Sequence, residues 1–106
     1  MPDSLQGTLD LLILKTLQHE ANHGFGITLH IQSVSQGLVT VEEGSLYPAL
    51  HRLERARLVT AKWQTTSNGR RARVYSLSAA GRKRLAEAEE SWSALAKGVG
   101  RILRFA

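Results

Sequence analysis

GSLYPALHRLE, residues 44–54, is the stretch that decides the fold of this chain of 106 residues. Its three leucines recur at helical spacing and would form one buried stripe. Ser45 is a good N-cap residue, so we expect a helix over residues 45–57 that begins there. Pro48 then falls within the first turn, where the missing N–H of a proline costs no hydrogen bond.

The remaining faces of this predicted helix are aromatic and basic. Tyr47, His51, Arg52 and Arg55 all lie away from the leucine stripe. An exposed helical face of this chemistry can reach the base edges and phosphates of a nucleic acid.

A first helix is predicted over residues 5–18. Its apolar stripe is made of Leu5, Leu9, Leu12, Ile13 and Leu17. Asp3 with Gln6 fits a capping box at its start. Leu11 and Leu14 fill the opposite side, and a helix that is apolar all round is buried on two sides. We therefore expect the second side to meet another chain.

A second helix is predicted over residues 24–35. Ile27, Ile31 and Val34 share one face, and Phe25 and Leu29 share another. The alternation over residues 25–31 would also fit a strand, but the length and the spacing to Val34 favour a helix, and Gly37 follows as a helix stop. Residues 38–41 are interpreted as a very short strand. Together with the helix over residues 45–57, these elements give three helices in the first half of the chain.

HEANHGFG, residues 19–26, matches the H-E-x-x-H pattern of zinc proteases. Such a site needs both histidines on one face of a continuous helix, together with a third ligand. Asn22 and two glycines interrupt any helix here, and Leu29 stands where the longer pattern requires a histidine. We therefore predict a turn between two helices, with no metal and no catalytic residues.

A β-hairpin follows the third helix. Val59, Ala61 and Trp63 alternate with polar residues, and the sequence returns through a second alternating strand that ends at Leu77. Asn68-Gly69 between the strands is a strong signal for a tight turn. The basic residues on this hairpin are Lys62, Arg70, Arg71 and Arg73.

A long last helix is predicted to begin after Ser78, a good N-cap, and to reach about residue 104. Its apolar seam repeats at alternating spacings of three and four and consists of Leu85, Ala88, Trp92, Leu95, Val99, Ile102 and Ala106. Such a heptad seam, about 40 Å long, exceeds what a small domain can cover. A second copy of the chain is the simplest cover, and folding back on the first helix is the alternative.

Charge is distributed unevenly along the chain. Residues 52–84 hold ten of the fourteen Lys and Arg residues and a single acid, Glu54, although the net charge is only +5. This block indicates a polyanionic partner, whereas an ordinary solvated face would mix the two signs.

Cysteine is absent, so disulfides and thiolate metal sites are excluded and a reducing compartment fits. No apolar run is long enough to span a bilayer, and the N-terminus lacks the basic start of a signal peptide. We expect a cytoplasmic protein without membrane attachment; residues 97–106 carry too few cations for a surface anchor.

The order of the elements, three helices and then a two-stranded hairpin with a basic tip, predicts a winged helix-turn-helix. The fold class is thus mainly α with a small β-hairpin, with residues 1–77 as the DNA-binding domain and residues 78–106 as a dimerisation helix. Such a fold places its third helix in the major groove and its hairpin on phosphate or in the minor groove. A protein-docking module is the alternative, and the arginines of the third helix argue against it.

The sequence resembles the PadR-like transcriptional regulators over nearly its whole length. The resemblance rests on LDLLIL (residues 9–14), HGFGI (23–27), GSLYPALHRLE (44–54) and GRRARVYSLSAAG (69–81). It departs from the family pattern at Gly26, which replaces an acidic residue, and at Leu29, which replaces a polar one. The chain is similar to the short branch of the family, which has one dimerisation helix.

The resemblance implies a bacterial homodimeric repressor of transcription, without enzymatic activity or cofactor. It implies operator contacts from the third helix and the wing, which match Ser45, Tyr47, Pro48, His51, Arg52, Arg70 and Arg71, and we add Lys62 and Arg73 from the charge pattern. The predicted dimer interface consists of Leu11, Leu14, Leu85, Trp92, Leu95, Val99 and Ile102. In some members a small aromatic ligand binds near that interface and releases the DNA. Trp92 would stack such a ligand here, although helical spacing alone also accounts for it.

Overall fold

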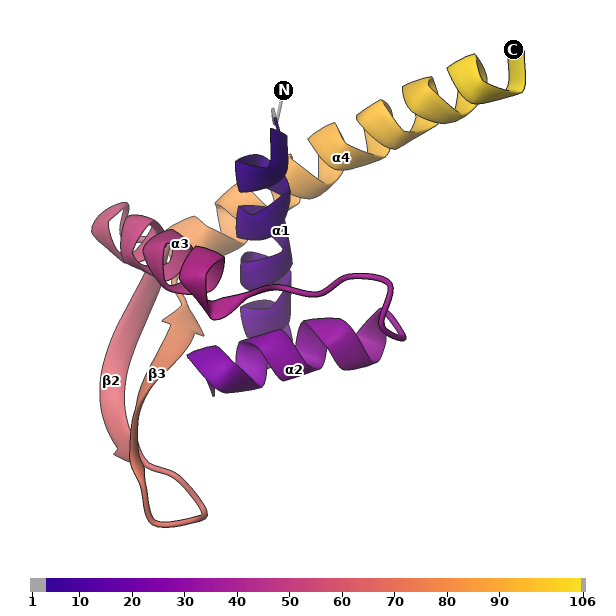
Figure 1. Cartoon of the computed structure of the whole chain (residues 1–106). Helices are drawn as coiled ribbons and strands as arrows, with labels where there is room; N and C mark the ends of the chain where they lie inside the picture. Colours follow the sequence, from indigo (N-terminus) through magenta and orange to yellow (C-terminus); the bar gives the residue numbers. More distant parts are fainter. Residues whose placement is uncertain (1–3, 106) are drawn as a thin grey trace.

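A computed structural model describes residues 4–105, and Figure 1 shows the arrangement of the elements. In chain order these are α1 (Ser4–His19), β1 (Asn22–His23), α2 (Gly24–Val34), α3 (Glu43–Arg55), β2 (Val59–Thr65), β3 (Arg71–Leu77) and α4 (Ala79–Phe105). The architecture is a winged helix-turn-helix that continues into one long helix, so the predicted fold class is confirmed. The capping box expected from Asp3 and Gln6 lies outside the described residues.

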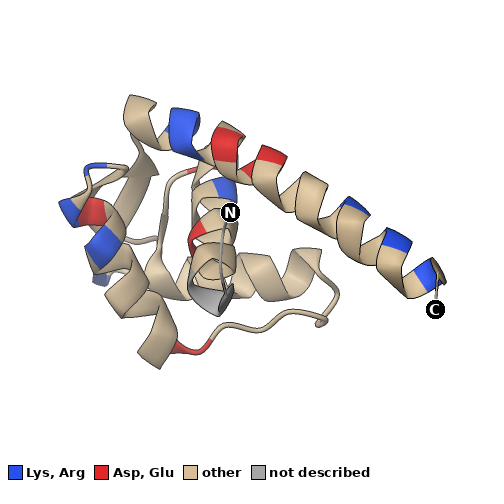
Figure 2. Ribbon diagram, turned by 90° about the horizontal axis from the view of Figure 1, so that it is seen from above, with Lys and Arg blue, Asp and Glu red and all other residues tan. Residues whose placement is uncertain are grey.

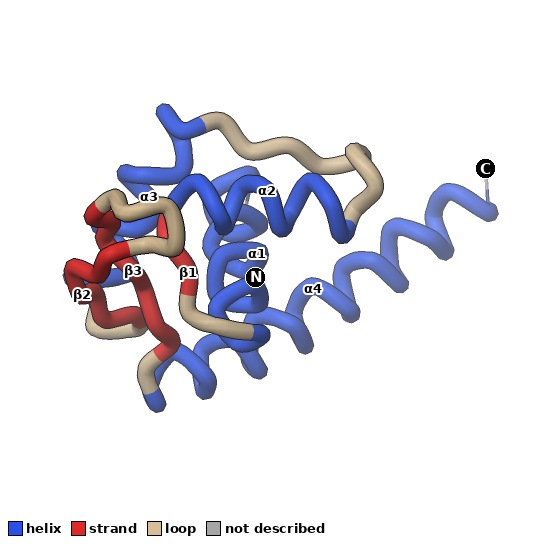
Figure 3. Tube along the Cα trace, turned by 90° about the horizontal axis from the view of Figure 1, so that it is seen from below, coloured by secondary structure: helices blue, strands red, loops and turns tan. Residues whose placement is uncertain are grey.

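The sheet has three antiparallel strands in the order β1-β3-β2 (Figure 3). The register of the hairpin runs from Val59 opposite Leu77 to Thr65 opposite Arg71. Asn22 and His23 pair with the other edge of β3. The segment predicted as a plain turn therefore holds a two-residue strand.

The short strand expected over residues 38–41 does not form, and that prediction was wrong. This segment belongs to the loop that leads into α3. Val39 and Val41 line a hollow against α1, and Val41 packs on the core, while Leu38 is exposed. Asn22 and His23, rather than this segment, form the third strand beside β3.

The core forms around α1, which contacts all three other helices and β3. Ile13 and Leu17 of α1 pack in one cluster with Ile27 of α2 and with the leucines of α3. Tyr75 of β3 closes this cluster from the side of the sheet. α1 is therefore covered on two sides within the same chain, whereas the sequence predicted that its second side would meet another chain.

Two residues of the predicted dimer interface belong to this core. Leu14 and Leu85 are each only 1% exposed. The first turns of α4 fold back across α1, where Lys15 also makes an ion pair with Glu89 at 3.2 Å. The alternative in which α4 packs on α1 of the same chain thus holds for the beginning of α4. Leu14 and Leu85 are therefore core residues and not part of the predicted interface.

Helix α3 begins earlier than predicted. Glu42 is its N-cap, and its carbonyl accepts hydrogen bonds from the N–H groups of Ser45 and Leu46, both at 3.0 Å. Ser45 is therefore a helical residue rather than the cap, and Pro48 lies in the second turn. The carbonyl that Pro48 cannot serve belongs to the exposed Gly44, where water can reach it.

The tight turn at the tip of the hairpin consists of three residues, 67–69. The N–H of Thr66 donates to the carbonyl of Arg70 at 2.6 Å, which extends the pairing by one step beyond the strands. The N–H of Gly69 then donates to the carbonyl of Thr66, and Gly69 has a φ of +83°. This is the three-residue hairpin geometry that needs a left-handed residue at its end.

Ser78 caps α4 as predicted. Its Oγ accepts from the N–H of Gly81 at 3.0 Å and donates to the carbonyl of Leu58 at 2.9 Å. The start of α4 is thereby fixed to the turn that joins α3 to β2. The second half of α4 then leaves the body of the molecule (Figure 1), whose longest dimension is 54 Å.

Candidate nucleic-acid interface

One long face of α3 is open to solvent. Ser45, Tyr47, Pro48 and His51 are all exposed on it, and so is Arg55 one turn further on. Within residues 4–105 no ion pair or side-chain hydrogen bond holds His51 or Arg55. These two side chains are therefore available to an external partner.

Arg52 is placed differently from the other predicted contacts of α3. Its guanidinium donates to Asp10 of α1 at 2.8 Å, and both side chains are about one third exposed or less. Burial raises the pKa of the Asp10 carboxyl above its ordinary value, while Arg52 acts in the opposite direction. Arg52 thus fixes α3 on α1, and its free donors are fewer than the sequence suggested.

Tyr47 bridges α3 and the start of α2. A Cβ on Gly24 would lie only 2.8 Å from the phenol oxygen of Tyr47, so this contact needs a glycine. The side chain still exposes 39% of its surface. Desolvation, Glu43 and Tyr75 all raise the pKa of Tyr47. The phenol therefore remains protonated and can donate a hydrogen bond to a phosphate or base.

The basic side chains of the hairpin are of two kinds, those without a partner and those that contact another side chain. Lys62 and Arg70 are exposed, and in the described part of the chain they have no ion-pair partner. Arg73 pairs with Glu54 of α3 at 2.6 Å, which fixes the hairpin against the third helix. The guanidinium of Arg71 lies over the ring of Trp63, 5.4 Å from its centroid.

Cations gather at the end of the molecule built from α3 and the hairpin (Figure 2). No acidic residue occurs between Glu54 and Glu87 in the sequence. The positive end carries the open face of α3, so shape and charge coincide as a polyanion interface requires.

Trp63 is an exposed aromatic residue of the hairpin that the predicted contacts did not include. The alternation of β2 placed it on the buried face with Val59, which is 1% exposed, yet Trp63 is 61% exposed. The hairpin extends beyond the core, so its inner face is uncovered towards the tip. The available signal was the position of Trp63 near the turn, opposite an arginine.

The far half of α4 carries an uncovered apolar surface. Its large side chains are between 43% and 94% exposed, in Trp92, Val99, Ile102, Leu103 and Phe105. Leu95 and Leu11, also in the predicted interface, are half-buried. The predicted seam is therefore exposed at Trp92, Val99 and Ile102, its residue Ala106 lies outside the described residues, and the dimer interface stays a prediction.

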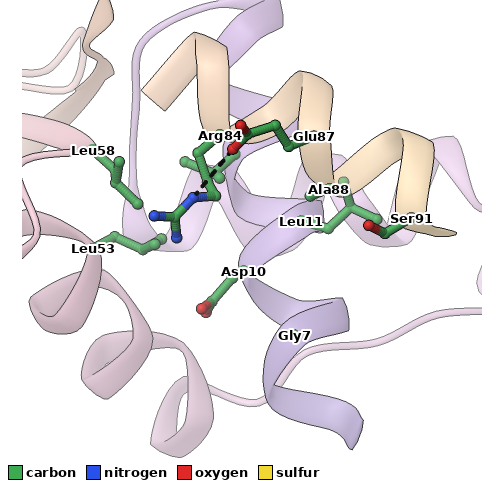
Figure 4. A pocket seen from close by; sticks show the side chains of 10 residues that line it. Gly7, Asp10, Leu11, Leu53, Leu58, Arg84, Glu87, Ala88 and Ser91 are labelled. Carbon is green, nitrogen blue, oxygen red and sulfur yellow. Dashed lines mark ion pairs between the residues drawn. The ribbon is translucent and has the colours of Figure 1, made fainter. Parts of the chain in front are cut away.

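A groove of about 360 Å³ lies between α1, α3 and the beginning of α4 (Figure 4). Leu11, Leu53 and Leu58 supply its apolar lining, and Asp10 and Arg84 supply polar groups. Trp92 is not among its lining residues. The predicted stacking of a ligand on Trp92 therefore involves a different surface from this groove.

The histidines of HEANHGFG have structural neighbours. The Nδ1 of His23 accepts from the N–H of Gly26 at 3.0 Å, so His23 is the N-cap of α2. His19 stacks on His30 with ring centroids 5.3 Å apart. A Cβ on Gly26 would meet the side chain of Asn22, which explains the glycine at this position. Among residues 4–105 no group of three metal-ligating side chains is present.

None of the helices in the described range is long and apolar enough to cross a membrane.

The comparisons with known proteins agree with this geometry. Residues 13–87 match the model of the transcriptional regulator PadR-like family. Transcriptional regulator Rv3488 of Mycobacterium tuberculosis is 38% identical over 89 residues, which cover 81% of this chain and 79% of the relative.

Solved structures of PadR-like regulators are similar to this chain. A PadR-like transcriptional regulator from Bacillus cereus superposes with a TM-score of 0.79 at 26% identity and covers 93% of this chain and 94% of its own. A PadR family regulator from Eggerthella lenta gives a TM-score of 0.74 at 30% identity, with coverage of 92% and 82%. These relatives are regulators and not enzymes. The chain therefore belongs to the PadR-like family of transcriptional regulators, whose winged helix binds DNA.

Proposed function

We propose that this regulator is a homodimeric repressor that binds a specific operator through α3 and the hairpin. The observation that carries the proposal is the open face of α3, flanked by free cations and by a hairpin fixed to it through the 2.6 Å pair of Arg73 with Glu54. A helix presented in this way fits the major groove, and the hairpin then reaches the neighbouring minor groove.

The contacts divide by chemistry. Tyr47 and His51, with Ser45 and Pro48 beside them, face the bases and the adjoining sugars. Arg55, Lys62 and Arg70 are exposed cations that neutralise phosphates. Arg52 and Arg73 are positioning residues, because each is already paired with a carboxylate of its own chain.

Dimerisation follows from α4. Residues 1–77 are the proposed DNA-binding domain and residues 78–106 the proposed dimerisation segment. The outer half of its helix α4 (Ala79–Phe105) has no cover in the described chain. Trp92, Leu95, Val99 and Ile102 repeat on this half, so a second copy would bury them. Two paired domains then read half-sites about 34 Å apart, or a multiple of that distance.

A small aromatic effector is the proposed inducer. Trp92 is 43% exposed on the proposed interface, so a planar ligand bound between two subunits can stack on its indole. Fluorescence titration with planar cations and phenolic acids, compared between the wild type and Trp92→Phe, tests this part alone. Absence of binding to every probe removes the effector while leaving the DNA-binding proposal in place.

The proposal as a whole is tested by an electrophoretic shift with random duplex, followed by footprinting on the promoter of the regulator's own gene. We expect weak binding to random duplex and a protected site of two half-sites on the promoter. A protein-docking module would bind neither, and that outcome would remove the proposed function.

A further inference from the structure

The exposed side chain of Trp63 contributes little to the stability of the fold. It is 61% exposed on β2, near the turn of the hairpin. An indole is the largest apolar side chain, and its burial contributes strongly wherever a partner covers it. Within residues 4–105, the guanidinium of Arg71 lies over the ring and no other aromatic ring stacks on it. A partner outside the chain is thus the remaining source of cover.

The direction in which Trp63 faces follows from the strand register. It lies opposite Arg73, and residues opposite each other in an antiparallel pair project to the same face. Arg73 pairs with Glu54 of α3, so this face of the hairpin is turned towards the third helix. Trp63 therefore lies on the same side as the proposed DNA-binding helix.

The surroundings of Trp63 select the chemistry of the partner. Arg71 lies over the ring, and the hairpin carries three further cations and no acidic side chain. A partner must therefore accept an apolar plane and a guanidinium side by side. The minor groove of a duplex does so, because its walls are deoxyribose rings and its negative potential attracts arginine.

A second copy of the chain does not fit this position. The exposed apolar surface of α4 lies at the opposite end of the molecule from the hairpin tip (Figure 1). The proposed dimer interface therefore leaves Trp63 uncovered in both subunits.

We propose that Trp63 is a DNA-contacting residue of the wing, which lays its indole against the sugars of the minor groove while Arg71, beside it, contacts a phosphate. This inference rests on the proposed function and adds to it an apolar contact that charge patterning did not reveal. Such a contact releases no counterions, so its contribution to affinity is insensitive to salt.

The two side chains of this pair are therefore separable by salt dependence. Trp63→Ala should weaken duplex binding by up to about tenfold and leave the slope of log K against log salt nearly unchanged. Arg71→Ala should instead reduce that slope by roughly 0.9 for each phosphate that the arginine neutralises. Trp63→Phe should retain part of the affinity, since an aromatic plane remains.

Fluorescence gives a direct reading, because Trp63 and Trp92 are the only tryptophans in the chain. We expect saturating random duplex of roughly two helical turns to change wild-type emission and to shield it from acrylamide. In Trp63→Phe, where only Trp92 emits, both effects should disappear. Thermal unfolding of each variant shows whether the fold is intact.

The possible results separate the contact of Trp63 from DNA binding as a whole. If the duplex binds in the shift assay but wild-type emission is unchanged, or the change persists in Trp63→Phe, Trp63 does not touch DNA and this inference is wrong. If the wild type binds no duplex at all, the proposed function itself fails. Disappearance of the optical signal in a folded Trp63→Phe that still binds supports the contact.

Discussion

The guanidinium of Arg52 on α3 lies 2.8 Å from the carboxylate of Asp10 on α1. The pair joins α3 to the central helix of the core, and Asp10 also lines the groove shown in Figure 4. In the proposed function, Arg52 therefore acts as a positioning residue that places α3, and it does not contact DNA itself. This distinguishes it from Arg55, one turn nearer the end of the same helix, which is exposed and unpaired in the described structure.

A double-mutant cycle tests the positioning role of Arg52. Arg52→Ala and Asp10→Ala should lower duplex affinity by similar factors, and the double variant should be little worse than either one, because both break the same ion pair. Since the pair is partly exposed, its coupling in the free energy of unfolding should be no more than about 1 kcal/mol.

Arg55→Ala is the matched control for this cycle. It should leave the unfolding midpoint unchanged and reduce the salt slope of binding by about 0.9. Additive reductions in affinity from Arg52→Ala and Asp10→Ala would show instead that Arg52 contacts the duplex directly.

The pKa of Asp10 should lie above the ordinary value for an aspartate. Burial is the main cause, and Arg52 opposes it, so Arg52→Ala should raise the pKa of Asp10 further. A pH titration of the side-chain carboxyl by NMR measures both values. A pKa below the ordinary value in the wild type would mean that the ion pair outweighs burial.

The raised pKa of Asp10 also affects how stability depends on pH. A carboxyl whose pKa is raised by folding holds its proton more tightly in the folded state. Its contribution therefore favours folding below the unfolded-state pKa and disappears as the pH rises through the raised, folded-state value. Asp10→Asn should remove this part of the pH dependence of the unfolding midpoint in acid.

Two glycines of α4 should respond to alanine in opposite ways. A Cβ on Gly81 would lie 2.1 Å from the carbonyl oxygen of Leu58, a backbone atom that cannot move away cheaply. Gly81→Ala should therefore destabilise the fold by about 1–3 kcal/mol. A Cβ on Gly98 meets nothing within 4 Å, so Gly98→Ala should stabilise α4 by up to about 1 kcal/mol.

Urea unfolding of the two variants measures both effects. Equal effects of the two substitutions would contradict the close approach of Gly81 to the backbone of Leu58, in the turn after α3. A decrease in stability in Gly98→Ala that grows with protein concentration would instead place Gly98 against a second copy.

The sequence predicted the elements well where local patterns decide the structure. The leucine stripe of α3, the Asn68-Gly69 turn and the cap at Ser78 each depend on neighbours within a few residues. The start of α3 was misplaced because Ser45 is a strong cap by type, whereas Glu42 begins the helix without a side-chain cap. The loop before α3 thus lets the helix begin after Glu42, although Ser45 has the higher propensity for the N-cap position.

Errors elsewhere came from contacts between distant segments. Leu14 and Leu85 look like interface residues until α4 is seen to cross α1, and the strand at Asn22-His23 forms only because β3 offers a free edge. Ion pairs explain why Arg52 and Arg73 are positioning residues rather than free cations. Nothing in the spacing of Arg52 and Arg73 indicates that Asp10 and Glu54 hold them, whereas the exposed His51 and Arg70 could be identified from pattern alone.

The central claim is that two copies joined through α4 bind one duplex, and sedimentation equilibrium with a labelled operator tests it most directly. We expect a dimer for the free wild type and two chains per duplex. Val99→Glu should yield a folded monomer whose operator affinity is strongly reduced. The affinity of the wild type should fall with salt at a slope near −5, if roughly six phosphates are neutralised. A wild type that remains monomeric and still binds the operator with full affinity would contradict the account.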